Sequence, residues 1–166
     1  MFSNLKRMFV AVLMMAGIGL LPVGSWAEDY HPTVDGGNLG LGLELGDPGA
    51  WGISGKFWLD QANAIQPAIK FNSPGSAILQ MDYLWHDYDV ARVKEGSLPF
   101  YIGVGGDLIL QNTVTVGARM PLGLSYIFDK KNVPIDIYFQ IVPTLWFYDS
   151  GATFDVYPEL GAHFYL

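Results

Sequence analysis

The sequence predicts an all-β protein, an eight-stranded antiparallel up-and-down transmembrane β-barrel. Eight segments alternate apolar and polar residues with a period of two, the pattern of a strand with one apolar face. Turn-forming residues separate these segments. Mean hydropathy is positive, at +0.25, yet after residue 27 no stretch is apolar over the length that a membrane helix needs. A membrane β-barrel reconciles these observations because each strand is apolar only at alternate positions.

The first half of the chain predicts four strands. Leucines at 39, 41, 43 and 45 alternate with four small or acidic residues, so one face of the first strand is entirely leucine. Asp47-Pro48-Gly49 is a strong turn signal. The same alternation recurs three times, and a longer polar connection follows at 87–99. These four strands are predicted at 38–46, 51–59, 65–71 and 79–86.

The second half predicts four more strands, separated by turn signals at 111–112, 129–132 and 149–151. They are predicted at 100–108, 114–126, 135–145 and 154–166. Four prolines fall inside predicted strands, and each removes a hydrogen-bond donor from the ladder. We interpret Pro67, Pro121, Pro143 and Pro158 as bulges or strand ends.

The N-terminus predicts export. Lys6 and Arg7 precede an uncharged apolar run of 14 residues from Met8 to Leu21, and small residues flank Trp26. This layout is typical of a secretory signal peptide, and the run is shorter than the ~20 residues of a membrane span. We therefore expect a signal peptide at 1–27, a periplasmic tail at 28–37 and an outer-membrane β-barrel domain at 38–166.

Composition excludes several classes of function. Removing Lys6 and Arg7 from the nine basic residues leaves seven against 16 acids, a net charge of −9 for the mature chain. Nucleic-acid binding needs a positive footprint, so we expect no such partner. Because the chain has no cysteine, thiol catalysis and cysteine-based metal sites are also excluded.

The composition of the two faces indicates which face points outward. Eight strands enclose a space only wide enough for side chains, and the bulky apolar residues would overfill it. We therefore expect lipid outside and a structural charge network inside, with Arg119 paired to carboxylates because an unpaired buried charge is costly. The predicted interior network is Glu44, Lys56, Lys70, Asp82, Asp107, Arg119, Asp136, Glu159 and His163.

Aromatic residues on the apolar face fall near the two ends of the strands, as membrane interfaces select. One predicted girdle contains Trp51, Phe71, Phe147 and Phe154. The other contains Phe57, Tyr83, Trp85, Phe100, Tyr126, Phe128 and Phe164.

The end of the chain, ELGAHFYL at 159–166, resembles the C-terminal strand of bacterial outer-membrane proteins, although it ends on Leu166 where the family usually has Phe. Residues 119–128 and 134–143 look like small, uncharacterised barrels of the OmpA-transmembrane and OmpX size class. The resemblance implies the fold, an outer-membrane location, contact with lipid and recognition of the last strand by the assembly machinery. Long external loops of that family are absent, because the predicted outer loops at 47–50, 72–77, 111–113 and 148–152 are short.

No catalytic, cofactor or metal site is expected. Glu159 and His163 share a face but lie about 13 Å apart along a strand, and no serine stands at a recognisable nucleophile position. His31 and His86 are expected to be solvated. We expect a non-enzymatic, monomeric outer-membrane barrel of a Gram-negative-type envelope, with a structural or interaction role and a filled lumen. A porin-like gated pore for small solutes is the alternative, and a soluble periplasmic ligand-binding barrel is a weaker one.

Overall fold

The computed structural model describes residues 38–46, 49–73, 75–91, 93–128 and 133–166, so the predicted signal peptide and tail lie outside the described residues. The described residues form only strands, turns and irregular segments. The strands are β1 (Leu39–Gly46), β2 (Ala50–Trp58), β3 (Asn63–Ser73), β4 (Ser76–Asp87), β5 (Phe100–Leu110), β6 (Val114–Arg119), β7 (Leu122–Ile127), β8 (Ile135–Tyr148) and β9 (Gly151–Tyr165).

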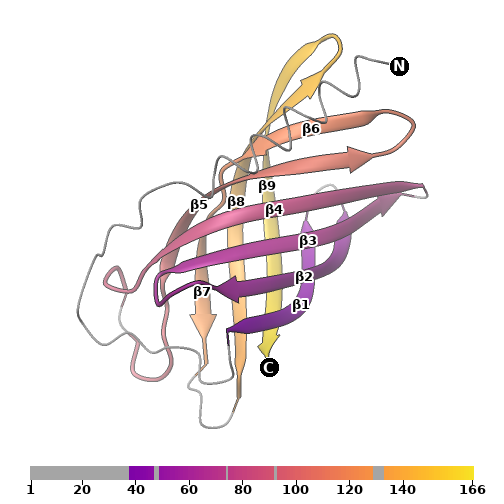
Figure 1. Ribbon diagram of the computed structural model, residues 1–166. Coiled ribbons are helices and arrows are strands. Elements are labelled where there is room, and N and C mark those ends of the chain that lie inside the picture. The colour runs from indigo at the N-terminus through magenta and orange to yellow at the C-terminus, as the bar shows by residue number, and fades with distance from the viewer. Residues whose placement is uncertain (1–37, 47–48, 74, 92, 129–132) are drawn as a thin grey trace.

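The strands form one antiparallel sheet, and eight of them close into a ring (Figure 1). The hydrogen-bonded order is β4-β3-β2-β1-β9-β8-β6-β5, and the β4–β5 pairing completes the circuit. The first and last strands are neighbours, with Leu41 opposite Phe164. No helix in the described parts of the chain is long and apolar enough to cross a membrane.

The structure corrects the predicted sixth strand, which is divided into β6 and β7 with Met120 and Pro121 between them. The two pieces keep one register: β5 and β8 each pair with both of them without a shift. β6 and β7 therefore occupy a single strand position, and this is why nine strands occupy the eight predicted positions.

Two prolines explain the gap. Gly103 donates to the carbonyl of Pro121 at 2.8 Å, and Met120 donates to the carbonyl of Pro143 at 3.0 Å. A hydrogen-bonded antiparallel pair normally exchanges two such bonds, but proline has no N–H to return the second. The ladder with β5 and the ladder with β8 thus each lose one hydrogen bond, at the adjacent residues Pro121 and Met120.

The prediction of a bulge or strand end is wrong for the other prolines. Pro143 and Pro158 lie inside β8 and β9, which keep one register over their whole length. Pro67 likewise lies inside β3 and pairs with Met81, and the one shift in this ladder falls later, between Phe71 and Ser73. A proline nitrogen faces only one neighbouring strand, so the ladder on its other side remains intact.

Side chains alternate between the two faces of the ring. β4 has buried residues at every second position, and the intervening residues are half-buried or exposed. The exposed set is apolar and includes Leu41, Leu43 and Ile53. Twelve apolar residues are buried in the described part of the chain, and seven of them form two small clusters, Trp58–Ala64–Ile127–Tyr165 and Leu84–Tyr101–Tyr138.

The strands differ in length, so the wall of the ring is uneven. β1 has eight residues and β2 has nine, whereas β8 has 14 and β9 has 15. The hairpin of β8 and β9 consequently projects beyond the ends of β1 and β2 (Figure 1).

Candidate functional site: a buried charge network

All nine ionisable residues predicted for the interior are buried, with at most 4% of any of them exposed. They lie on eight different strands, every strand except β7 contributing. Their contacts join strands that are not neighbours in the sheet, such as β3 with β9 and β2 with β8. The side chains therefore meet across the interior of the ring.

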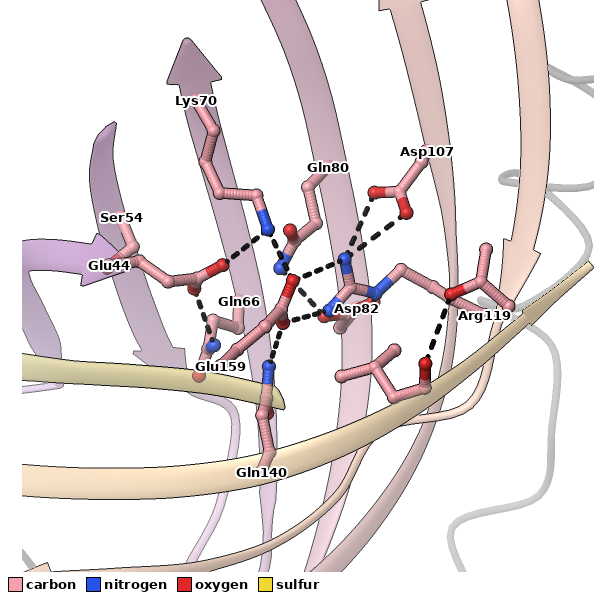
Figure 2. Close-up of polar contacts among 12 residues, drawn as sticks. Glu44, Ser54, Gln66, Lys70, Gln80, Asp82, Asp107, Arg119, Gln140 and Glu159 are labelled. Atoms are coloured by element: carbon pink, nitrogen blue, oxygen red, sulfur yellow. Dashed lines mark hydrogen bonds and ion pairs between the residues drawn. The ribbon is translucent and has the colours of Figure 1, made fainter. Parts of the chain in front are cut away.

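Arg119 is the centre of the larger cluster (Figure 2). Its Nη1 lies 3.1 Å from Asp107 and its Nε lies 3.0 Å from Asp82. Its Nη2 contacts Glu159, which belongs to β9. Each side of the guanidinium thus faces a carboxylate, as a buried arginine requires.

Lys70 links Glu159 to a fourth carboxylate, since its ammonium contacts Glu159 and lies 2.9 Å from Glu44. Neutral hydrogen-bond donors also contact these two carboxylates: Gln140 donates to Glu159 at 2.6 Å and the Tyr138 hydroxyl donates to Glu44 at 2.6 Å. The cluster holds four acids and two bases, so hydrogen bonds from neutral groups are needed to stabilise the excess negative charge.

A second cluster surrounds Asp136. Its carboxylate lies 3.3 Å from the ammonium of Lys56, accepts from Tyr165 at 2.8 Å, and lies 2.9 Å from Nδ1 of His163. The other ring nitrogen of His163 lies 3.0 Å from the hydroxyl of Ser54. An imidazole protonated on Nδ1 satisfies both contacts, donating to Asp136 and accepting from Ser54.

The contact between Ser54 and His163 was not predicted from the sequence. The two residues lie on β2 and β9, and both are paired with Gly42 of the intervening strand β1. Because Gly42 has no side chain, nothing separates the hydroxyl from the ring. The order Ser–His–Asp is that of a nucleophilic triad, but Ser54 is only 4% exposed, so its hydroxyl is enclosed. Glu159 does not join His163, as the spacing predicted, and binds Arg119 instead.

Aromatic rings fill the space around these clusters. Tyr101 is paired with Gly123 and Tyr138 with Gly161, and a Cβ on either glycine would overlap the tyrosine ring. The signal in the sequence is an inward tyrosine opposite an inward glycine on the next strand, but it can be found only once the register is known.

His86 corrects another expectation, because it is only 6% exposed rather than solvated. Its Nδ1 bonds the carbonyl of Ala62 at 3.0 Å, and its ring lies 4.4 Å from that of Trp58. Tyr88, just after β4, packs against the cluster of Trp58, and burial raises the pKa of its phenol above the usual range. These residues fill the end of the ring that contains the C-terminus. His31 lies outside the described residues.

The eleven aromatic residues predicted for the membrane interfaces all lie on the outer face, half-buried or exposed. Trp51 and Phe154 are the most exposed, at 60% and 63%. Neighbouring rings contact one another near both ends, as in the pairs Trp51–Phe71 and Tyr83–Trp85.

Within the described ranges, no group of three or more His, Cys, Asp or Glu side chains could hold a metal ion. Comparison with protein-family models, curated proteins and solved structures finds no match to this chain. Function is therefore inferred from the geometry of the chain itself.

Proposed function

We propose that the mature chain is a β-barrel of a bacterial outer membrane, with lipid around its outer face and a structural or interaction role that involves no catalysis. One observation carries the proposal: the outer face is apolar while the buried face carries the charges. Leu43, Ile53 and Trp51 are each at least 60% exposed, whereas Glu44, Lys56 and Asp136 are fully buried. A ring in water would be stabilised by the opposite arrangement.

The strand lengths support a membrane span. A nine-residue strand such as β2 is about 30 Å long. A tilt of about 40° reduces its height to about 23 Å, close to the ~25 Å apolar band of outer-membrane barrels. A strand of the length of β2 is thus suited to the apolar band, and the longer β8 and β9 would extend beyond it.

The filled interior favours a plugged barrel over a pore. Arg119, Lys70 and four carboxylates form one connected cluster, and Tyr101 and Tyr138 pack beside it. Small eight-stranded barrels generally have interiors filled by side chains. We therefore expect no steady conductance in planar bilayers, and open-channel currents would favour the gated pore instead.

A matched pair of variants tests the membrane placement. Leu43 lies in the middle of β1 and Val90 lies in the connection after β4, and both are 62% exposed. In a bilayer, Leu43→Arg should destabilise the fold by ~2–4 kcal/mol, whereas Val90→Arg should change little. If the ring is instead surrounded by water, neither substitution should change the free energy of unfolding by more than ~0.5 kcal/mol, since both sites are on the surface.

The stability of each variant is measured by urea unfolding of the protein folded in lipid vesicles. The location of the wild type is tested separately, by extracting the protein from outer membranes. The extracted protein should show a heat-dependent shift in gel mobility, as a folded detergent-resistant barrel does. Recovery of the wild type from the soluble periplasmic fraction, with equal stability for the two arginine variants, would refute the proposal and favour the soluble binding barrel.

A further inference from the structure

Among the described residues, the first half of β9 has a partner strand on only one side. The pairing of β9 with β1 ends at Glu159 opposite Gly46, whereas its pairing with β8 continues to Gly151. Within the part of the chain that the structure describes, residues 151–158 are thus hydrogen-bonded to a strand on one side only. This segment forms the free side of the projecting β8–β9 hairpin (Figure 1).

The direction of each backbone group on this edge follows from the register. Tyr165 donates to Pro134 just before β8, and Leu166 donates to Leu39 of β1, so odd residues of β9 face β8 and even ones face β1. No register shift interrupts the β8–β9 ladder. The N–H and C=O groups of Ala152, Phe154 and Val156 therefore point away from the sheet, at a place where β1 has already ended.

The edge lacks several of the features by which proteins block unwanted strand pairing. It carries no lysine and no bulge, and its proline, Pro158, lies at the end next to β1. The side chains that flank the free groups are accessible, with Phe154 63% and Val156 50% exposed. An unpaired run of this kind is the usual docking site for an added strand.

We propose that the edge of β9 at 151–158 binds an extended segment of a partner protein as an additional antiparallel strand, and that this segment alternates apolar and basic residues. The apolar side chains would lie beside Phe154 and Val156 on the outer face. The basic ones would lie on the face of Asp155. The hairpin at 143–158 contains two aspartates and no lysine or arginine, so its charge favours a basic partner.

A second copy of the chain is a poorer occupant, because pairing two β9 edges would bring two acidic hairpins together. The inference goes beyond the proposed membrane location and does not depend on it, since the hairpin projects past the shorter strands in either setting.

The test uses the folded mature protein in detergent micelles and a fluorescent peptide that alternates valine and lysine. We expect saturable binding of this peptide, and weaker binding when glutamate replaces lysine or when the same residues are arranged in two blocks. Asp155→Asn should weaken binding of the lysine peptide several-fold. Equal binding of all three peptides would overturn the proposal, because it would indicate partition into the micelle.

A pair of variants at one position isolates the backbone contribution. Phe154→Pro removes an outward N–H without removing a bond to β8, and Phe154→Ala removes the side chain but keeps the N–H. The proline variant should bind the lysine peptide roughly three- to tenfold more weakly than the alanine variant, as expected for one lost backbone hydrogen bond. Equal affinities would contradict strand addition.

Hydrogen exchange of the wild type supplies a measurement that needs no variant. On peptide binding, the amides of Ala152, Phe154 and Val156 should gain protection, and unchanged exchange at all three would overturn the proposal. A heat-dependent mobility shift establishes that each variant is folded. Light scattering that detects a wild-type dimer, dissociated by Phe154→Pro, would assign the edge to self-association instead.

Discussion

Removal of Arg119 is the sharpest test of the buried network. In Arg119→Ala, Asp82, Asp107 and Glu159 lose their shared cation, and Lys70 contacts only the last of these. Breaking one buried ion pair costs ~3–5 kcal/mol, because the remaining charge stays desolvated. Three carboxylates are affected here, so we expect a loss of at least ~3 kcal/mol. Since small proteins are stable by only about 5–15 kcal/mol, the loss would be a large fraction of the total.

The assay is urea unfolding in detergent micelles, followed by tryptophan fluorescence. Trp58 and Trp146 are buried at 5% exposure, so their emission should report the opening of the ring. Lys94→Ala is the control, because Lys94 is an exposed basic residue in the connection between β4 and β5. A double variant, Arg119→Ala with Asp107→Asn, should recover part of the loss by removing one uncompensated charge.

An unfolding midpoint of Arg119→Ala equal to that of wild type and Lys94→Ala would refute the reasoning. It would mean that the three carboxylates are hydrated or protonated without the arginine, and that the cluster does not stabilise the ring. A double variant less stable than Arg119→Ala would likewise contradict the charge argument, since Asp107 would then contribute through contacts other than Arg119.

Two further predictions concern glycine and proline. Gly161→Ala should destabilise the protein by ~1–3 kcal/mol in the same urea assay, because the added methyl overlaps the ring of Tyr138, whereas Gly55→Ala has space and should change little; equal effects would show that the ring is not held against Gly161. Pro143→Val should change stability by less than ~1 kcal/mol, because the regained hydrogen bond is offset by a freer unfolded chain. By hydrogen exchange, the new amide at 143 should be protected through the carbonyl of Met120, and rapid exchange there would mean that the missing donor does not cause the gap between β6 and β7.

The alternation of residues predicted much of the architecture. Strand positions and the division into polar and apolar faces follow from a period of two, which is a local property. The nine interior charges and the eleven outer aromatics therefore lie on the faces that the pattern predicts. The prediction of bulges or strand ends was wrong for Pro67, Pro143 and Pro158, because the effect of a proline depends on which neighbouring strand its nitrogen faces, and the sequence of a single strand does not contain that information.

By itself, the sequence determined which side chains share a face, because the alternation of side chains follows from strand geometry alone. Only the tertiary structure decided which of them meet. Arg119 with Glu159, Lys56 with Asp136, and Ser54 with His163 come from strands far apart in the chain, and their contacts depend on the closure of the ring and on its register. Within the described residues, the same closure left residues 151–158 of β9 paired with β8 but with no strand on the other side, because β1 is shorter than the strand it joins. That difference becomes an unpaired edge only when the first and last strands lie side by side.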